Sequence, residues 1–97
     1  MMAIEIVSFS KQPSNELMKQ HRMFLRRKAD QQKLVMGGRF ADKFGSLMLW
    51  QVDSMNEARE IAMEDPYFQN GITTFILKEW GLTWNFLVNP PLQPKLG

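Results

Sequence analysis

The sequence contains no cysteine and a single histidine among its 97 residues. Disulfide bonds and metal sites built from thiolates are therefore excluded, and we expect no bound metal. The glycine-rich motifs that hold nucleotide phosphates, G-x-x-x-x-G-K-[ST] and G-x-G-x-x-G, do not occur in the chain. The protein is therefore predicted to work without a metal, nucleotide, flavin or haem cofactor.

The sequence also lacks a long hydrophobic run and a strong excess of charge of either sign. No apolar stretch approaches the roughly 18 residues that a membrane-spanning helix needs. The first residues, MMAIEIVSFSKQPS, do not have the basic start and long apolar core of a signal peptide. The net charge is only +2, from 12 basic and 10 acidic residues, which does not indicate a nucleic-acid partner. We expect a cytoplasmic protein that binds neither membranes nor nucleic acid.

The chain does contain enough apolar material for one compact domain. Hydrophobic residues make up 44% of it and aromatic residues 11%, which is typical of a folded globule. A chain of this length is expected to form a single core. We predict one domain over residues 1–85, followed by a C-terminal tail at 86–97 whose prolines prevent it from joining a sheet.

Hydrophobic spacing divides this domain into six elements. Strand-like segments lie at residues 3–9, 34–40, 46–52 and 73–80, and segments with helical spacing run over residues 14–32 and 54–65. Ser54 and Glu57 form the S-x-x-E capping box that starts the second helix. The order of elements predicts an α+β fold of the ferredoxin-like split βαβ type (βαββαβ). In this fold two helices cover one face of a four-stranded antiparallel sheet.

The third and fourth predicted strands are apolar on both faces. In the third strand, Leu47 and Leu49 alternate with Met48, Trp50 and Val52. The two helices cover only one face, and a large apolar sheet face is rarely left exposed in a soluble monomer. We therefore expect a second copy of the chain to cover the other face, so that the protein is a homodimer.

The only histidine and one aspartate occupy positions from which they can meet. His21 falls on the apolar stripe of the first helix, and Asp65 ends the inner face of the second helix, directly before Pro66. A carboxylate beside an imidazole orients the ring and favours its protonated form, which makes a proton-transfer unit. The other interpretation is structural: a histidine satisfied within the core and an aspartate that caps a turn.

Between residues 3 and 81 the chain carries a pattern of fourteen residues, namely His21, Leu25, Gly37, Gly38, Gly45, Ser46, Ser54, Glu57, Ala58, Asp65, Pro66, Tyr67, Gly71 and Trp80. This pattern resembles the YciI-like family of the dimeric α/β-barrel superfamily. The resemblance implies a ferredoxin-like protomer, a dimer of facing sheets and a cleft that holds a His–Asp pair. Characterised relatives include a dehydrochlorinase that acts on a chlorinated hydroxyhydroquinone. The wider superfamily includes oxygenases and cofactor-free isomerases such as muconolactone isomerase.

The resemblance implies that His21 is a general acid or base and that Asp65 orients it. The expected activity is then an elimination or isomerisation by proton transfer, of lyase or isomerase type, on a small hydroxylated or enolic substrate. The alternative is a non-catalytic small-molecule-binding or accessory dimer, in which the His–Asp pair is structural. RNA binding, which the same topology also serves, is disfavoured because the third strand, SLMLWQV, lacks the aromatic motif on which bases stack.

Four further residues are candidates for contact with a substrate. Arg39 follows a pair of glycines and could bind an anionic group through two hydrogen bonds, or lie as an exposed charge at the rim. Gly38 belongs to that glycine pair, which in a strand marks a bulge or a close approach. Ser46 lies at a family position but has no base beside it in the sequence. Tyr67 is expected to pack under the helix end or to offer its hydroxyl group to the pocket.

Overall fold

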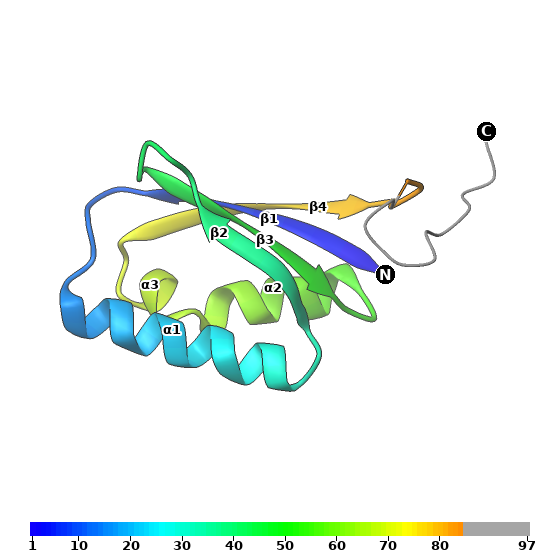
Figure 1. The fold of residues 1–97 in the computed structure, drawn as a ribbon, viewed down its shortest axis with the longest axis horizontal. Coiled ribbons are helices and arrows are strands. Elements are labelled where there is room, and N and C mark those ends of the chain that lie inside the picture. The colour runs from blue at the N-terminus through cyan, green and yellow to red at the C-terminus, as the bar shows by residue number, and fades with distance from the viewer. Residues whose placement is uncertain (85–97) are drawn as a thin grey trace.

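The computed structural model describes residues 1–84, and the tail predicted at 86–97 lies outside the described residues. The elements follow in the order β1 (Met2–Phe9), α1 (Asn15–Asp30), β2 (Leu34–Arg39), β3 (Gly45–Gln51), α2 (Met55–Glu64), α3 (Pro66–Gln69) and β4 (Thr73–Trp80). All strand pairs are antiparallel, in the order β2-β3-β1-β4, and the helices lie on one side of the sheet (Figure 1). The predicted ferredoxin-like fold is confirmed. The four-residue helix α3 is an addition that the sequence did not predict.

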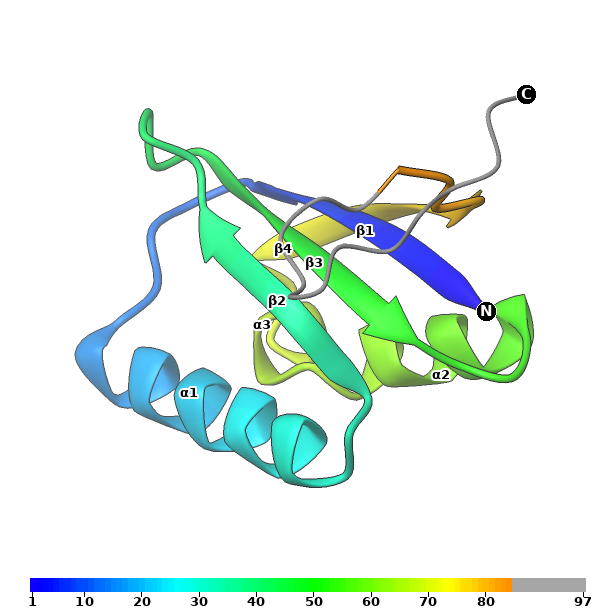
Figure 2. The ribbon, with the colours of Figure 1, turned by 45° about the vertical axis from the view of Figure 1, so that its right-hand side comes forward.

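The central strand β1 determines which residues face the helices. Ala3, Glu5 and Val7 are buried beneath the helices, whereas Ile4 and Ile6 alternate with them on the opposite face. The core lies between this inner face and the two longer helices, as the turned view shows (Figure 2). None of the helices in residues 1–84 is long and apolar enough to cross a membrane.

Side-chain contacts hold α1 against the sheet and connect it to the end of α2. Phe24 of α1 packs edge-to-face on Trp50 of β3, with ring centroids 6.5 Å apart. Lys28 of α1 forms an ion pair of 3.0 Å with Glu64 near the end of α2. This pair connects the helices close to the point where α2 ends. The first helix therefore passes next to Asp65, the residue that follows Glu64.

Serine side chains cap the starts of both long helices, and the one at Ser54 was predicted by its capping box. Ser14 accepts a hydrogen bond from Leu17 N–H, and Ser54 accepts one from Glu57 N–H, each at 3.1 Å. Glu57 Oε1 in turn accepts the N–H of Asp53 rather than that of Ser54, at 3.2 Å. The predicted capping box therefore forms with its return bond shifted by one residue.

The chain leaves helical geometry at Asp65, which has an extended ψ of 127°. Pro66 disfavours a helical conformation at the preceding residue and then begins α3, where its missing N–H has no cost. Helix α3 ends at a turn through Gly71, whose φ of +72° suits glycine. Asp65 therefore lies at a rigid junction between two helices.

The glycine pair in β2 allows that strand to lie close to its neighbour. A Cβ atom at Gly37 would overlap the Sδ atom of Met48, whereas one at Gly38 would meet nothing within 4 Å. The bulge in this strand lies earlier, between Leu34 and Met36. The glycine pair predicted a bulge or a close approach. The close approach occurs at Gly37, next to Met48, and the bulge lies just before the pair.

Candidate functional site

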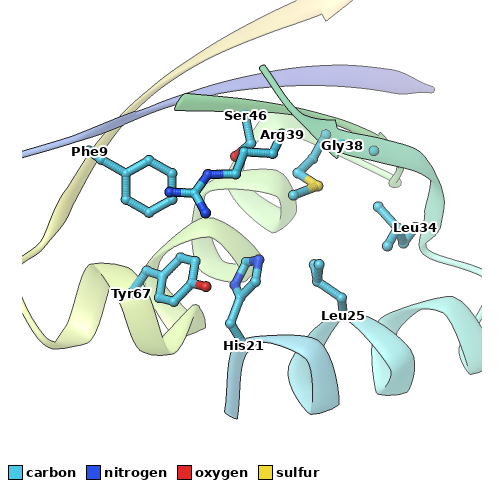
Figure 3. A pocket seen from close by; sticks show the side chains of 10 residues that line it. Phe9, His21, Leu25, Leu34, Gly38, Arg39, Ser46 and Tyr67 are labelled. Carbon is cyan, nitrogen blue, oxygen red and sulfur yellow. The ribbon is translucent and has the colours of Figure 1, made fainter. Parts of the chain in front are cut away.

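A pocket of about 170 Å³ opens between α1, α3 and the β2–β3 edge of the sheet. Its lining comprises Phe9, His21, Leu25, Leu34, Gly37, Gly38, Arg39, Ser46, Met48 and Tyr67. The walls are mostly apolar, and the polar groups come from a few residues (Figure 3). A dry apolar cavity of about 150 Å³ accommodates a benzene ring. The pocket is therefore of the right size for a single six-membered ring.

His21 enters the pocket from α1 and is held from behind by Asp65. The His21 Nδ1 and Asp65 Oδ1 atoms are 2.9 Å apart, and the two side chains are only 12% and 8% exposed. Since an ionised carboxylate can only accept hydrogen bonds, Nδ1–H is the donor. In the neutral ring, Nε2 then carries the free lone pair. This arrangement leaves one imidazole nitrogen available for proton exchange with a bound molecule.

Asp65 is itself fixed by the start of α3. Its Oδ1 atom also accepts the backbone N–H of Tyr67 at 2.9 Å, in a buried hydrogen bond. One oxygen atom thus caps a helix and orients the imidazole. Because the cap and the proline fix the backbone, the carboxylate needs little rearrangement to hold His21.

Tyr67 packs directly on the ring of His21. The two rings are nearly parallel, with an interplanar angle of 10° and centroids 3.9 Å apart, and Phe9 meets the edge of Tyr67 at 5.4 Å. Burial raises the pKa of the Tyr67 hydroxyl; Asp65 adds to this effect, and nearby arginines oppose it. The phenol therefore stays protonated at neutral pH and can donate a hydrogen bond.

Arg39 places a positive charge at the mouth of the pocket. Its guanidinium lies over the ring of Phe9, 4.8 Å from the centroid, and Figure 3 shows it on the same side of the pocket as Ser46. Nη2 of Arg39 donates to the backbone oxygen of Lys43 at 3.1 Å and also contacts the side chain of Gln12. The cation is thus held at the rim by the β2–β3 turn and remains exposed to an incoming ligand.

The chain matches the family described as the YCII-related domain over residues 1–81. It belongs to the YCII-related family. The chain is also 37% identical to the uncharacterised protein YjpA of Bacillus subtilis (strain 168) over 62 residues, which are 64% of this chain and 73% of YjpA. The sequence-based resemblance is thereby confirmed.

A solved structure shares the fold of this YCII-related chain. It is 5-chloro-2-hydroxyhydroquinone dehydrochlorinase (TftG) from Burkholderia phenoliruptrix AC1100, in complex with 2,5-dihydroxybenzoquinone. The TM-score is 0.64, with 84% of this chain and 94% of TftG covered and 18% of residues identical. At this level of identity the likeness concerns the fold.

The structure of the YCII-related protein brings the six predicted site residues to one place. Five of them line the pocket, namely His21, Gly38, Arg39, Ser46 and Tyr67, and Asp65 lies behind the imidazole. Within residues 1–84, no hydrogen bond joins Ser46 to His21. Nor does this part of the chain contain a group of three or more side chains that could hold a metal ion.

The sequence did not predict the apolar residues that line the pocket, nor the burial of the Glu5 carboxyl group. Phe9, Leu25 and Leu34 lie on inward-facing positions that periodicity marks as core, so nothing distinguished them as pocket lining. Glu5 is the one charged residue of β1. It is 2% exposed, and burial is the main reason that its pKa rises to about 7. The signal for Glu5 was therefore present in the sequence, but its partner was not evident.

Proposed function

We propose that this protein is a cytoplasmic, cofactor-independent enzyme that transfers a proton on a small hydroxylated or enolic substrate, in an elimination or an isomerisation. His21 is the general acid or base, and Asp65 orients it. The observation that carries the proposal is the 2.9 Å hydrogen bond from Nδ1 to Asp65 beside a ring-sized pocket. That bond leaves Nε2 of the imidazole available to the substrate.

The chemistry follows from the lone pair on Nε2. His21 removes a proton from a carbon or oxygen atom of the substrate, and the negative charge of Asp65 stabilises the resulting imidazolium. In an elimination, the electrons of the broken C–H or O–H bond form a new C=C or C=O double bond, directly or by a shift through the conjugated ring, and the leaving group departs with its own bonding pair. In an isomerisation, His21 returns the proton to a different atom of the same molecule.

The remaining lining suits a planar ring with an acidic oxygen. Arg39 supplies a positive charge for an enolate or carboxylate, and the Tyr67 hydroxyl supplies a hydrogen-bond donor. Ser46 and the backbone at Gly38 offer further polar contacts along the β2–β3 wall. The ligand named in the complex of TftG, 2,5-dihydroxybenzoquinone, is a ring of this kind. Its enol groups are acidic because each is conjugated to a carbonyl group, so the molecule is a suitable probe for this pocket.

Titration calorimetry with 2,5-dihydroxybenzoquinone tests the binding part of the proposal. Arg39→Gln should weaken binding about tenfold. A hydrogen bond to a charged group contributes about 1.5–3 kcal/mol, and the lower end of this range applies because Arg39 is exposed. Arg59→Gln, which removes an exposed arginine of α2 away from the pocket, is the matched control and should bind as wild type. Equal affinities for the two variants would contradict the role of Arg39.

Chloride release from 5-chloro-2-hydroxyhydroquinone tests the catalytic part. His21→Gln should lower the rate by about 10²–10⁴-fold, the usual contribution of a general acid or base. Asp65→Asn should lower it less, because the amide oxygen still orients the ring without the charge. If neither substitution changes turnover or ligand binding, the pair is structural. The non-catalytic small-molecule-binding or accessory dimer is then the better account.

We also propose that a second copy of the chain covers the outer face of the sheet. Ile6 lies on that face between its cross-strand neighbours Leu47 and Ile76, and Ile76 remains 60% exposed. Sedimentation at micromolar concentration should give about twice the chain mass of 11.4 kDa. Ile76→Glu should yield a monomer, whereas Met23→Glu on the exposed side of α1 should not. A wild-type monomer would refute the dimer.

A further inference from the structure

A carboxyl group that the proposed reaction does not use is buried next to the pocket. Glu5 lies in the central strand on the face that the helices cover, and only 2% of it is exposed. Its cross-strand neighbours are Met48 of β3 and Leu77 of β4. Met48 lines the pocket. Glu5 is therefore one side chain removed from the space that a ligand would fill.

The hydrogen bond that Glu5 makes does not by itself require an acid. The indole Nε1–H of Trp50 donates to Glu5 Oε1 at 3.0 Å, and both side chains are buried. A glutamine would accept the same hydrogen bond with almost the same shape and without any charge. A carboxyl group in this position costs stability whenever it ionises. What the acid adds over the amide is a site that binds and releases a proton.

The charges that act on Glu5 belong to the candidate site. Asp65 raises the pKa of Glu5 and His21 lowers it, after the larger effects of burial and of the Trp50 hydrogen bond. Within residues 1–84, the cross-strand neighbours of Glu5 are the apolar Met48 of β3 and Leu77 of β4. The buried residues of α2, namely Ala58, Ile61 and Ala62, are apolar as well. The electrostatic neighbours of Glu5 are thus the two residues of the proposed proton-transfer pair.

We infer that Glu5 is a third proton-binding group of this site, a buried carboxyl group whose charge is coupled to that of the His21–Asp65 pair. Coupling between titrating groups is reciprocal. Glu5 does not line the pocket, so it acts through His21 and Asp65 as a positioning residue. Its meaning for catalysis rests on the proposed function, because its charge acts on the proposed proton-transfer pair.

The indole N–H of Trp50 reports the ionisation of Glu5 directly, since it is hydrogen-bonded to that carboxylate. The chain has only three tryptophans, so the indole region of a ¹H–¹⁵N spectrum is simple. In the free wild-type protein the Trp50 peak should shift in one step with a midpoint of about pH 7. Glu5→Gln should abolish this step. Glu79→Gln, which removes an exposed carboxyl group from β4, should leave it unchanged.

The coupling between Glu5 and the His21–Asp65 pair is tested by two substitutions that change neither Glu5 nor Trp50. Asp65→Asn should lower the midpoint because it removes a neighbouring negative charge, and His21→Gln should raise it because it removes a neighbouring positive charge. Shifts in opposite directions are the result that a purely structural Glu5 would not give. The inference would be overturned if the midpoint in both variants equalled that of the wild type. It would also be overturned if the step persisted in Glu5→Gln. Because the titration uses the protein without ligand, its result does not depend on whether the quinone binds or reacts.

Discussion

Replacing Glu5 with glutamine should stabilise the protein above pH 7 and leave its stability near pH 4.5 almost unchanged. The substitution keeps the size of the side chain and an oxygen that can accept the indole N–H of Trp50. It removes the ionisation of a carboxyl group whose pKa rises, mainly through burial, from 4.5 to about 7. The charged form of Glu5 is therefore disfavoured in the folded protein.

The sign and the size of the effect follow from these two pKa values. Between pH 4.5 and about 7, the folded protein keeps a proton on Glu5 that the unfolded chain releases. The free energy of unfolding therefore falls as the pH rises through this window. One pKa unit corresponds to about 1.4 kcal/mol, so the full loss above pH 7 is about 3 kcal/mol. Since glutamine cannot ionise, Glu5→Gln should gain about this amount over wild type at alkaline pH.

Urea unfolding over a series of pH values between 4.5 and 8 measures this difference by linear extrapolation. Urea is uncharged, so it does not screen the interactions of Glu5. All variants are compared at one protein concentration, because the proposed dimer would be more stable at higher concentration. The control is Glu79→Gln, in which an exposed carboxyl group is lost from the neighbouring strand. A difference between Glu5→Gln and wild type that stays constant with pH would refute the reasoning, and so would an equal gain in the control.

Two further predictions concern residues that line the pocket. Gly37→Ala should weaken the binding of 2,5-dihydroxybenzoquinone, measured by calorimetry, because the new Cβ would overlap Sδ of Met48 and force this pocket-lining side chain to move. Gly38→Ala should lose much less affinity, since its Cβ would meet nothing within 4 Å. Tyr67→Leu should lower the free energy of unfolding in urea more than Tyr67→Phe does, because only leucine loses the stack on the His21 ring. The difference should be about 0.5–1.5 kcal/mol, the usual contribution of an aromatic pair beyond its buried area.

The fold could be predicted because the apolar spacing of each element agrees with its place in the sheet. The alternation around Met48 and Trp50 fixes both faces of β3, and Ser54 caps the start of α2 as its capping box predicts. Helix α3 escaped prediction because its four residues are too few to show a helical period. It begins at Asp65 and Pro66, where the sequence indicated the end of a helix and a turn but not a further helix.

The sequence could predict which residues belong to the candidate site, but not the contacts between them. The 2.9 Å hydrogen bond between His21 and Asp65 joins positions 44 residues apart, and spacing indicated only that the two helices might bring them together. The stack of Tyr67 on His21 depends on α3, so it could not be foreseen. The buried state of Glu5 depends on Trp50, which lies 45 residues further along the chain. Periodicity describes one element at a time, and these features each need two elements in contact.

The structural and catalytic roles of Asp65 can be distinguished by a substitution that removes only its charge, but not by one that removes the whole carboxyl group. Its Oδ1 atom accepts hydrogen bonds from both Tyr67 N–H and the His21 ring, so an alanine would lose the cap of α3 together with the orientation of the imidazole. Asparagine keeps an oxygen that can accept both bonds and loses only the negative charge. If the charge of Asp65 is what prepares His21 for proton transfer, Asp65→Asn should fold like wild type and still react more slowly. If the aspartate serves only as a cap, the same variant should differ from wild type in neither respect.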